Sequence, residues 1–366
     1  MTAAIVVNSA WNIRNFRKGL LRALLEAGHR VVVIAPGAEA LGEDAGAGDV
    51  LHISLVHLRR KGLNPLRDVL LLRELAVIYR RERVDVALHF TIKPIIYGSL
   101  AARWTGTRNV STLTGLGYTF LTGGAVNRLV RRLYRFALAS ADRVFFHNSD
   151  DLALFTGDGL VDAGRAAVVP GSGLNAADFP YADFADAVTG RFLFAGRLLI
   201  DKGIREYVAA ARLALARRPD LAFHIVGGLD PGNPASVPAA ELQGWIDEGT
   251  VVYENEAPDI RMHLRAAALV VLPSYREGCP RVLLEAGATG RPVIACDVPG
   301  SRFVVDPGVT GWLTAAKDVS ALTATLLSAA ETPPDALAEM GRAGRRRVEE
   351  HFRERVVNAA YLRAIG

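Results

Sequence analysis

The sequence predicts an α/β protein built from two doubly wound, parallel-sheet domains. The chain has 366 residues, half of them hydrophobic, and single hydrophobic cores stop growing near ~250–300 residues. Short apolar runs of strand length alternate with amphipathic stretches of helical length along the whole chain. This alternation is typical of parallel sheets that are covered by helices on both faces.

The first domain is expected over residues 1–180. Its expected strands are "AAIVVN", "RVVVIA", "VLHISL", "VDVALHF", "NVSTLT", "RVFFH" and "AAVVP". Between them the helical pattern recurs at 14–27, 65–82, 94–104, 125–139 and 149–156. A turn-rich segment, 171–190, then separates this domain from the next.

The second domain is expected over residues 181–350, with the same alternation. Its expected strands are "RFLFAG", "LAFHIVGG", "TVVYE", "LVVLP" and "RPVIAC", and its expected helices are 203–217, 238–248, 257–267 and 280–289. A final helix within 351–366 is expected to pack back on the first domain. Such sheets bind ligands at the C-terminal ends of their strands. Two facing domains are expected to form a cleft between them.

Charge and cysteine content narrow the class of protein. The net charge is +5, but residues 1–180 carry 22 Lys and Arg against 15 Asp and Glu, whereas residues 181–366 carry 21 against 23. The basic half is therefore expected to meet an acidic partner. Two cysteines without paired spacing, no signal-peptide pattern and no apolar run of ~18–20 residues predict a cytoplasmic chain from a reducing compartment.

The stretch "SYREGCPRVLLEAGATG", residues 274–290, places two carboxylates around an expected helix start. Glu277 follows an apolar strand, Pro280 suits the first turn of a helix, and Glu285 lies farther along that helix. Unpaired N–H groups at the helix start can bind phosphate, and the carboxylates can bind hydroxyls. This pattern favours a nucleotide sugar as ligand. The alternative is that Glu277 only complements the helix dipole and Glu285 faces solvent.

A second motif, "RFLFAGRLLIDKG", opens the second domain. Gly196 ends a strand and allows a ligand to approach the backbone closely. Arg197 and Lys202 are cations suited to a diphosphate, the first as a planar fork and the second as a point charge. Alternatively, Arg197 pairs with Asp201 and Lys202 only begins a helix.

Together, "FAGRLLIDKG", "VVLPSYREGCPRVLLEAGATGRPVIACDVPG" and "DPGVTGWL" resemble the donor domain of retaining GT-B glycosyltransferases of family 4. The resemblance implies a GT-B fold. It also implies that Arg197 and Lys202 hold the donor diphosphate, that Glu277 contacts the transferred sugar and that Glu285 contacts the ribose. The implied catalytic residues are Glu277, Arg197 and Lys202. The donor-binding set is Gly196, Arg197, Lys202, Glu277, Gly278, Cys279, Val282, Leu283 and Glu285.

The stretches "NSAWNIRNFRKGLLRALLEAGHRVVVIAP", "FTIKPIIYGSLAARWTG" and "TLTGLGYTFLTGG" resemble a narrower group, which builds capsule, O-antigen and related glycans on polyprenyl-diphosphate carriers. The resemblance implies retaining transfer of a hexose or N-acetylhexosamine from a nucleotide sugar, expected to be UDP-linked, to a polyprenyl-diphosphate-linked saccharide. The expected acceptor-binding residues follow the first, fourth and fifth strands. They are Trp11, Asn12, Asn15, Lys93, Thr114, Gly115, Gly117 and Tyr118.

The chain departs from the family pattern in two places. Many family members place a histidine near the transferred sugar, where this chain has "TLTGLGYTF". His89 and His147 lie near strand ends, but neither clearly replaces it, and a structural role is favoured for both. Cys279 stands where relatives usually carry another small or apolar residue, and it is expected to be passive.

No metal or other cofactor is expected. The chain has no Asp-x-Asp motif, with which GT-A enzymes hold a divalent ion, and no His/Cys cluster with ligand spacing. Arg197, Lys202 and helix amides are expected to neutralise the leaving diphosphate instead.

A basic amphipathic stretch, "GGAVNRLVRRLYRFALAS", spans residues 123–140. Near an anionic leaflet each cation contributes ~1 kcal/mol, so Arg128, Arg131, Arg132 and Arg135 are expected to dock the protein on the inner face of the plasma membrane. The alternative is an ordinary core-packed helix with a solvated face.

Two other functions stay open from sequence. One is a GT-B-shaped nucleotide-sugar epimerase or hydrolase, which would consume donor without an acceptor. The other is a noncatalytic basic module that binds nucleic acid, although no helix-turn-helix, RRM or zinc module is recognisable.

Overall fold

The computed structural model describes residues 1–45, 50–59, 64–116, 124–255, 257 and 259–366. The chain divides into two compact units, one of Met1–Gly173 with Glu354–Gly366 and one of Leu174–Arg353. The boundaries therefore lie after Gly173 and Arg353 rather than after residues 180 and 350. The reason is local: the Leu174 N–H donates to the Phe352 carbonyl at 2.8 Å, so the start and the end of the second unit meet.

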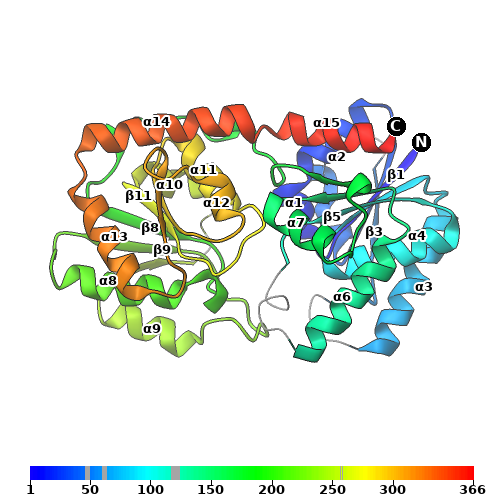
Figure 1. The fold of residues 1–366 in the computed structure, drawn as a ribbon, viewed down its shortest axis with the longest axis horizontal. Coiled ribbons are helices and arrows are strands. Elements are labelled where there is room, and N and C mark those ends of the chain that lie inside the picture. Colours follow the sequence, from blue (N-terminus) through cyan, green and yellow to red (C-terminus); the bar gives the residue numbers. More distant parts are fainter. Residues whose placement is uncertain (46–49, 60–63, 117–123, 256, 258) are drawn as a thin grey trace. The chain divides into compact units, whose positions relative to one another are not determined.

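The first unit contains a seven-stranded parallel sheet with the strand order β3-β2-β1-β4-β5-β6-β7. Strands β1, β3 and β5 of this sheet are labelled in Figure 1. Each of the seven expected runs overlaps one of these strands. Their bounds are β1 Thr2–Val6, β2 Arg30–Ala35, β3 Val50–Ser54, β4 Val86–Phe90, β5 Arg108–Leu113, β6 Arg143–Phe146 and β7 Ala166–Val168. β1, β2 and β4 are almost wholly buried, which explains their continuous apolar runs.

The helices of the first unit follow the expected pattern, with two differences. They are α1 Ala10–Phe16, α2 Lys18–Glu26, α3 Pro65–Arg81, α4 Ser99–Thr105, α6 Gly124–Leu138, α7 Ser149–Gly157 and α15 Glu354–Ile365. The single helix expected over 14–27 is broken at Arg17, whose buried guanidinium lies 3.9 Å from the Phe90 ring centroid. The helix expected from residue 94 begins with a wide π-helical turn, Pro94–Gly98, before α4.

The second unit contains a six-stranded parallel sheet with the order β10-β9-β8-β11-β12-β13. Its strands are β8 Arg191–Ala195, β9 Ala222–Val226, β10 Val252–Glu254, β11 Leu269–Leu272, β12 Val293–Cys296 and β13 Gly311–Thr314. The five expected strands are present. β13 was not predicted, because its four residues, Gly-Trp-Leu-Thr, have no clear apolar run or alternation.

The helices of the second unit are α8 Ile204–Leu215, α9 Ala239–Asp247, α10 Ile260–Ala266, α11 Arg281–Thr289, α12 Ser301–Val304, α13 Val319–Glu331 and α14 Pro334–His351. α11 packs on α14 through glycines. A Cβ atom on Gly341 would lie 2.1 Å from the Gly290 carbonyl oxygen, so glycine is required where these helices approach each other.

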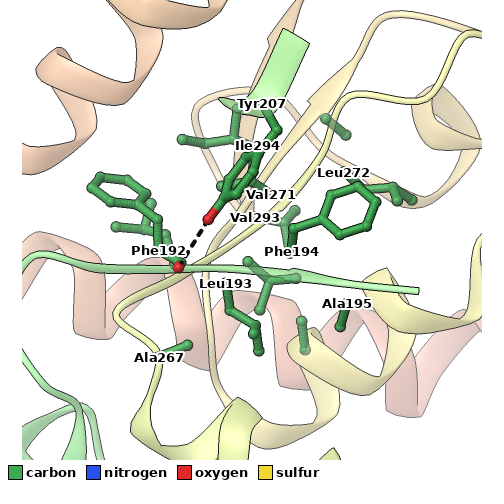
Figure 2. Packing of buried hydrophobic residues seen from close by; sticks show 14 of the residues in the cluster. Phe192, Leu193, Phe194, Ala195, Tyr207, Ala267, Val271, Leu272, Val293 and Ile294 are labelled. Atoms are coloured by element: carbon green, nitrogen blue, oxygen red, sulfur yellow. Dashed lines mark hydrogen bonds between the residues drawn. The ribbon is translucent and has the colours of Figure 1, made fainter. Parts of the chain in front are cut away.

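The core of the second unit supports the end of β8. The rings of Phe192 and Phe223 stack with centroids 5.1 Å apart. The Tyr207 hydroxyl donates to the Phe192 carbonyl at 3.0 Å (Figure 2). Phe194 and Tyr207 are fully buried, and each such ring stabilises the unit by roughly 1.5–3 kcal/mol through burial. A rigid strand therefore delivers Gly196 and Arg197 to the edge of the sheet.

α15 belongs to the first unit although it follows the second in sequence. Tyr361 and Ile365 are buried in the same hydrophobic cluster as β1, β2 and β4. The Tyr361 hydroxyl lies 3.0 Å from Thr112 Oγ1, and Arg108 donates to the Ile365 carbonyl at 2.6 Å. The last helix thus completes the core of the first unit.

Candidate active site

The predicted donor residues gather where the strand order of the second sheet reverses, between β8 and β11. Doubly wound sheets bind ligands at the carboxyl ends of the strands at such a point. Gly196 follows β8 with φ +150°, which an L side chain rarely adopts. Glu277 lies in the loop after β11, and Lys202 ends a short turn before α8.

Lys202 and Glu277 form an ion pair, in which Lys202 Nζ donates to Glu277 Oε1. The side chains are 25% and 10% exposed, respectively, so the pair is partly buried but still reaches solvent. A lysine ammonium carries three donors, and a ligand at this edge can therefore bind Lys202 while the contact to Glu277 persists. The fold thus brings two predicted donor-site residues into direct contact, and this pairing was not predicted from the sequence.

Two glycines fix the Glu277 loop by close backbone approach. A Cβ atom on Gly203, at φ +72°, would lie 2.0 Å from the Pro273 carbonyl oxygen. A Cβ atom on Gly300, at φ +80°, would lie 2.5 Å from the carbonyl oxygen of Glu277. The loop is therefore held on two sides by backbone that admits no side chain.

Glu285 is paired and mostly buried, contrary to the alternative that it faces solvent. Its side chain is 14% exposed, and Arg281 Nε donates to Glu285 Oε1 at 2.8 Å. Burial raises the pKa of the Glu285 carboxyl, while the charge and hydrogen bond of Arg281 oppose that shift. Pro280 caps α11 rather than lying in its first turn, because its ψ of 112° is extended.

Arg197 pairs with a residue that the sequence analysis did not identify. Arg197 Nη1 donates to Asp230 Oδ2 at 2.9 Å, in the turn-rich segment after β9. The alternative pairing with Asp201 is therefore wrong. The Arg197 side chain is 46% exposed, so it is accessible to a ligand.

The remaining predicted donor residues lie around the start of α11. Leu283 is buried in the core, Val282 and the half-buried Cys279 pack against the same cluster, and burial raises the pKa of the Cys279 thiol. These side chains face the core, so a contact from this turn to a ligand would use backbone N–H groups. Gly278 lies in the same loop and backs onto Gly300.

The predicted acceptor residues of the first unit surround the point where its strand order reverses, between β1 and β4. Trp11 and Asn12 lie in the first turn of α1, directly after β1. Trp11 is 56% exposed, and Asn15 Nδ2 donates to its carbonyl at 2.9 Å. Within the described residues, Asn12 Oδ1 is buried without a hydrogen-bond partner.

Lys93 is positioned by a carboxylate that the sequence analysis missed. Lys93 Nζ donates to Asp68 Oδ1 at 2.8 Å, and the Tyr97 hydroxyl donates to Asp68 Oδ2 at 2.9 Å. Asp68 is buried on α3, where it interrupts an apolar face; that interruption was the available signal. Thr91, two residues before Lys93, has φ +71°, which is unusual for a β-branched residue.

Thr114 and Gly115 follow β5 and are half-buried, and Gly115 has φ +134°. Gly117 and Tyr118, the other predicted acceptor residues of this segment, lie outside the described residues. The structure therefore brings the three predicted acceptor segments to one edge of the sheet, because β1, β4 and β5 are neighbours.

The contacts of His89 agree with a structural role. Tyr79 Oη lies 2.7 Å from His89 Nε2, and Asn109 Oδ1 lies 2.9 Å from His89 Nδ1. Burial lowers the pKa of His89 to about 4. His147 is also buried, and burial together with the charge of Arg17 lowers its pKa to about 3. Both imidazoles are therefore neutral at pH 7.

The four arginines of α6 that were predicted to bind the membrane fall into two pairs. Arg131 forms an ion pair with Asp158, and Arg135 Nη2 donates to the Asp158 carbonyl at 3.0 Å. Arg128 and Arg132 are exposed, beside the exposed apolar residues Val126, Leu129 and Phe136. Among the described helices, none is long and apolar enough to span a bilayer. The described residues contain no group of three or more His, Cys, Asp and Glu placed to hold a metal ion.

Both units match known protein families. Residues 13–171 match the family described as glycosyl transferase 4-like domain, and residues 189–332 match the family described as glycosyl transferases group 1. Two curated relatives align over most of the chain. An N,N'-diacetylbacillosaminyl-diphospho-undecaprenol α-1,3-N-acetylgalactosaminyltransferase from Campylobacter jejuni is 26% identical over 348 residues, which is 89% of each chain. A UDP-Gal:α-D-GlcNAc-diphosphoundecaprenol α-1,3-galactosyltransferase from Escherichia coli is 25% identical over 289 residues, 73% of this chain and 72% of the relative.

Solved structures show the same fold. Sucrose-phosphate synthase from Thermosynechococcus elongatus superposes with a TM-score of 0.82 at 21% identity, covering 99% of this chain and 98% of that one. An Anabaena protein solved with UDP and glucose superposes with a TM-score of 0.80 at 19% identity, covering 100% and 99%. The expected architecture of two Rossmann-like units, the GT-B fold, is confirmed.

Proposed function

We propose that this glycosyltransferase of GT-B fold transfers a hexose or N-acetylhexosamine from a UDP-sugar to a polyprenyl-diphosphate-linked saccharide with retention. The chain carries a glycosyltransferase 4-like domain and a group 1 domain. The observation that carries the proposal is the Lys202–Glu277 ion pair at the point where the strand order of the second sheet reverses, between β8 and β11. The names of the Campylobacter jejuni and Escherichia coli relatives support a polyprenyl-linked acceptor.

In the donor site, Arg197 and Lys202 would bind the diphosphate. Negative charge on the leaving phosphate grows as the bond to the sugar breaks, so a cation that contacts this phosphate stabilises the transition state more than the ground state. The N–H groups at the start of α11 would add to this stabilisation without reorganisation. On this basis we propose that the enzyme needs no metal ion.

The two glutamates would bind hydroxyl groups. Glu277, next to Lys202, would contact the transferred sugar, and Glu285, one helix turn past Arg281, would contact the ribose. A carboxylate can accept hydrogen bonds from two adjacent hydroxyls at once. The Arg281 contact keeps one Glu285 oxygen engaged and opposes the effect of burial on its pKa.

The acceptor would bind at the β1/β4 edge of the first unit. Trp11 offers an exposed ring for a sugar face, Asn12 has an oxygen with spare bonding capacity, and Lys93 offers N–H groups beyond the one that contacts Asp68. In the proposed step, the acceptor hydroxyl oxygen bonds to the anomeric carbon as the bond from that carbon to the phosphate oxygen breaks. The acceptor proton passes to this phosphate oxygen on the same face, and the products are the glycoside and UDP.

We also propose that the enzyme works at the inner face of the plasma membrane, because a polyprenyl chain keeps its acceptor in the bilayer. The exposed arginines and apolar residues of α6 would meet anionic lipid there, where each cation contributes ~1 kcal/mol.

The test is transfer from a panel of UDP-sugars to undecaprenyl-diphosphate-linked N-acetylhexosamine, with the anomeric configuration of the product read by NMR. We expect one UDP-sugar to give an α-linked product, and Glu277→Gln to abolish transfer while the protein stays folded. Consumption of donor at equal rates with and without acceptor would instead identify an epimerase or hydrolase.

A further inference from the structure

Tyr275 lies two residues before Glu277 and is held by contacts from two other segments of the second unit. Its hydroxyl donates to Glu206 Oε1 at 2.7 Å, and its N–H donates to the Asp201 carbonyl at 2.9 Å. Lys317 Nζ lies 4.6 Å from the centroid of its ring. The hydroxyl, the backbone and the ring face of Tyr275 are therefore each engaged.

These contacts connect the same two segments that carry the Lys202–Glu277 pair. Asp201 directly precedes Lys202, and Glu206 lies in the first turn of α8, which starts two residues after Lys202. Tyr275 belongs to the loop that contains Glu277. The Tyr275 contacts and the Lys202–Glu277 ion pair therefore join the same two segments at adjacent positions. A change in the Tyr275 contacts should shift these segments relative to each other and so alter the separation of Lys202 and Glu277.

Glu206 depends on Tyr275 for its hydrogen bonding. Its Oε1 accepts from the Tyr275 hydroxyl, and its Oε2 is buried without a hydrogen-bond partner in the part of the chain that the structure describes. A buried carboxylate oxygen without a donor is costly, and loss of the Tyr275 hydroxyl would also remove the donor to Oε1. The hydrogen bond between Glu206 and Tyr275 therefore strongly restricts the position of both side chains. Burial and Glu206 raise the pKa of the Tyr275 hydroxyl, which therefore stays a donor.

Lys317 adds a third constraint, from the loop after β13. It has φ +61°, in the left-handed region that a lysine rarely adopts. Such a conformation persists where surrounding contacts determine it, and it is common at functional sites. The position of its ammonium over the Tyr275 ring is a cation–π contact, and it holds the ring from the side of β13.

We propose that Tyr275, through Glu206 and Asp201, is a positioning residue that sets the separation of Lys202 and Glu277 and so controls the rate of sugar transfer rather than the affinity for the nucleotide. The proposal rests on the proposed roles of Lys202 and Glu277 in the donor site. Tyr275 is half-buried and stands outside the hydrophobic cluster of the second unit. Loss of its hydroxyl should therefore alter the geometry of the site more than the stability of the fold.

The experiment compares Tyr275→Phe, Glu206→Ala and Glu206→Gln with wild type. The matched control is Tyr181→Phe, which removes a hydroxyl from an exposed tyrosine beside Gly290, at the opposite edge of the sheet. For each variant, kcat is measured for transfer and for hydrolysis of the donor without acceptor, and the Kd of UDP and the Tm are determined. Hydrolysis needs no acceptor, so it reports on Tyr275 even if the proposed acceptor is wrong.

We expect Tyr275→Phe to lower kcat about 10–100-fold, because displacements of ~1 Å in a site can cost about 100-fold. The Kd of UDP should change less than about twofold. Glu206→Ala should match Tyr275→Phe, the double variant should be no slower than either single variant, and Glu206→Gln should recover most of the rate because its amide oxygen still accepts the bond. Tyr181→Phe should resemble wild type.

Three results would overturn the proposal. One is an unchanged kcat in Tyr275→Phe. Another is a kcat loss that is matched by an equal loss of UDP affinity, which would place Tyr275 in direct contact with the nucleotide. The third is a lowered Tm with a normal rate per folded molecule, which would leave Tyr275 a purely structural role. Failure of wild type to use a polyprenyl-linked acceptor, with the variant series as expected, would instead reject the proposed acceptor alone.

Discussion

Each of the two predicted donor glutamates is paired with its own cation. Lys202 contacts Glu277 across two segments, whereas Arg281 contacts Glu285 along one helix at i, i+4. The two pairs differ in what they can do. Lys202 keeps donors available for a phosphate, while Arg281 mainly holds Glu285 in place.

Lys202→Ala should therefore lower kcat by about 100–1,000-fold, the range observed when a single donor to a developing anion is removed. The Kd of the UDP-sugar should weaken much less, because the charge that Lys202 meets grows in the transition state. Steady-state kinetics combined with equilibrium binding separates the two effects. Lys18→Ala, at an exposed lysine of α2, is the matched control and should resemble wild type. A variant that binds donor poorly but turns over normally would refute this role.

The same site is proposed to work without metal. We expect activity to persist in EDTA, since Arg197, Lys202 and the start of α11 supply the positive charge. Loss of activity on chelation, restored by Mg²⁺ or Mn²⁺, would contradict the metal-free mechanism.

His89 and His147 make the first unit sensitive to acid. Their folded pKa values, about 4 and about 3, lie below the unfolded value of ~6.5. The unfolded state then binds more protons, so the stability they contribute is present above pH ~6.5 and is lost as pH falls towards 4. We expect ~2 kcal/mol of lost stability per histidine between pH 7 and pH 5.

Denaturant unfolding at pH 7 and pH 5 measures this loss. His147→Gln should reduce the pH dependence, whereas His351→Gln, at an exposed position of α14, should not. Equal pH dependence in both variants would show that His147 contributes nothing to it.

The amphipathic helix α6 has one face that packs into the core of the first unit and one face that is exposed. Val130, Tyr134 and Ala137 pack into a core cluster with β6 and α7, while Arg131 and Arg135 contact the turn after α7. These two arginines therefore stabilise the unit. Arg128 and Arg132, with the exposed apolar residues beside them, form the surface that we propose meets lipid.

The double variant Arg128→Gln/Arg132→Gln should weaken binding to vesicles that contain anionic lipid, with little change in Tm. Wild-type binding should fall with added salt, because attraction fades within a Debye length of ~8 Å at physiological ionic strength. Sedimentation with anionic and neutral vesicles measures both effects. The matched control is Arg342→Gln/Arg346→Gln on α14, which removes the same charge from the second unit. Equal sedimentation of the α6 variant and wild type would show that this face is only solvated.

The first unit of the molecule is built from two separate parts of the chain, Met1–Gly173 and Glu354–Gly366. α15 returns after the second unit, and Tyr361 packs its ring against Phe90 and Phe145 at centroid distances of 5.7 and 5.1 Å. The cores of the two units consist of separate clusters. Damage to α15 should therefore remain within the first unit.

Tyr361→Ala tests this separation. Removing a fully buried aromatic ring costs ~3–5 kcal/mol, and hydrogen exchange should accelerate in β4 and β5 of the first unit but not in β8–β13. Val356→Ala, at an exposed position on the same helix, is the control for loss of a side chain there. Uniform acceleration in both units would mean that they unfold as one cooperative body.

The two-sheet architecture could be predicted from sequence, and so could the places of Gly196, Arg197, Lys202, Glu277 and Glu285 relative to the strands and helices. These depend on short-range patterns, namely apolar runs, glycines at strand ends and a proline before a helix, which neighbouring residues record directly. Every expected strand is present for this reason. β13 was missed because its four residues have no clear apolar run or alternation, and the break between α1 and α2 was missed because it depends on the packing of Arg17 over Phe90.

Which charged side chains contact each other could not be read from the sequence. Lys202 reaches Glu277 across 75 positions of sequence, Arg197 reaches Asp230 across 33, and Lys93 reaches Asp68 across 25. These contacts depend on the order in which strands join the sheets and on the place where each helix crosses them. Periodicity reports the face of an element on which a residue lies, but not the element that packs against that face. The proposed donor residues could therefore be located from sequence, whereas their ion pairs and the hydrogen bonds that hold Tyr275 could not.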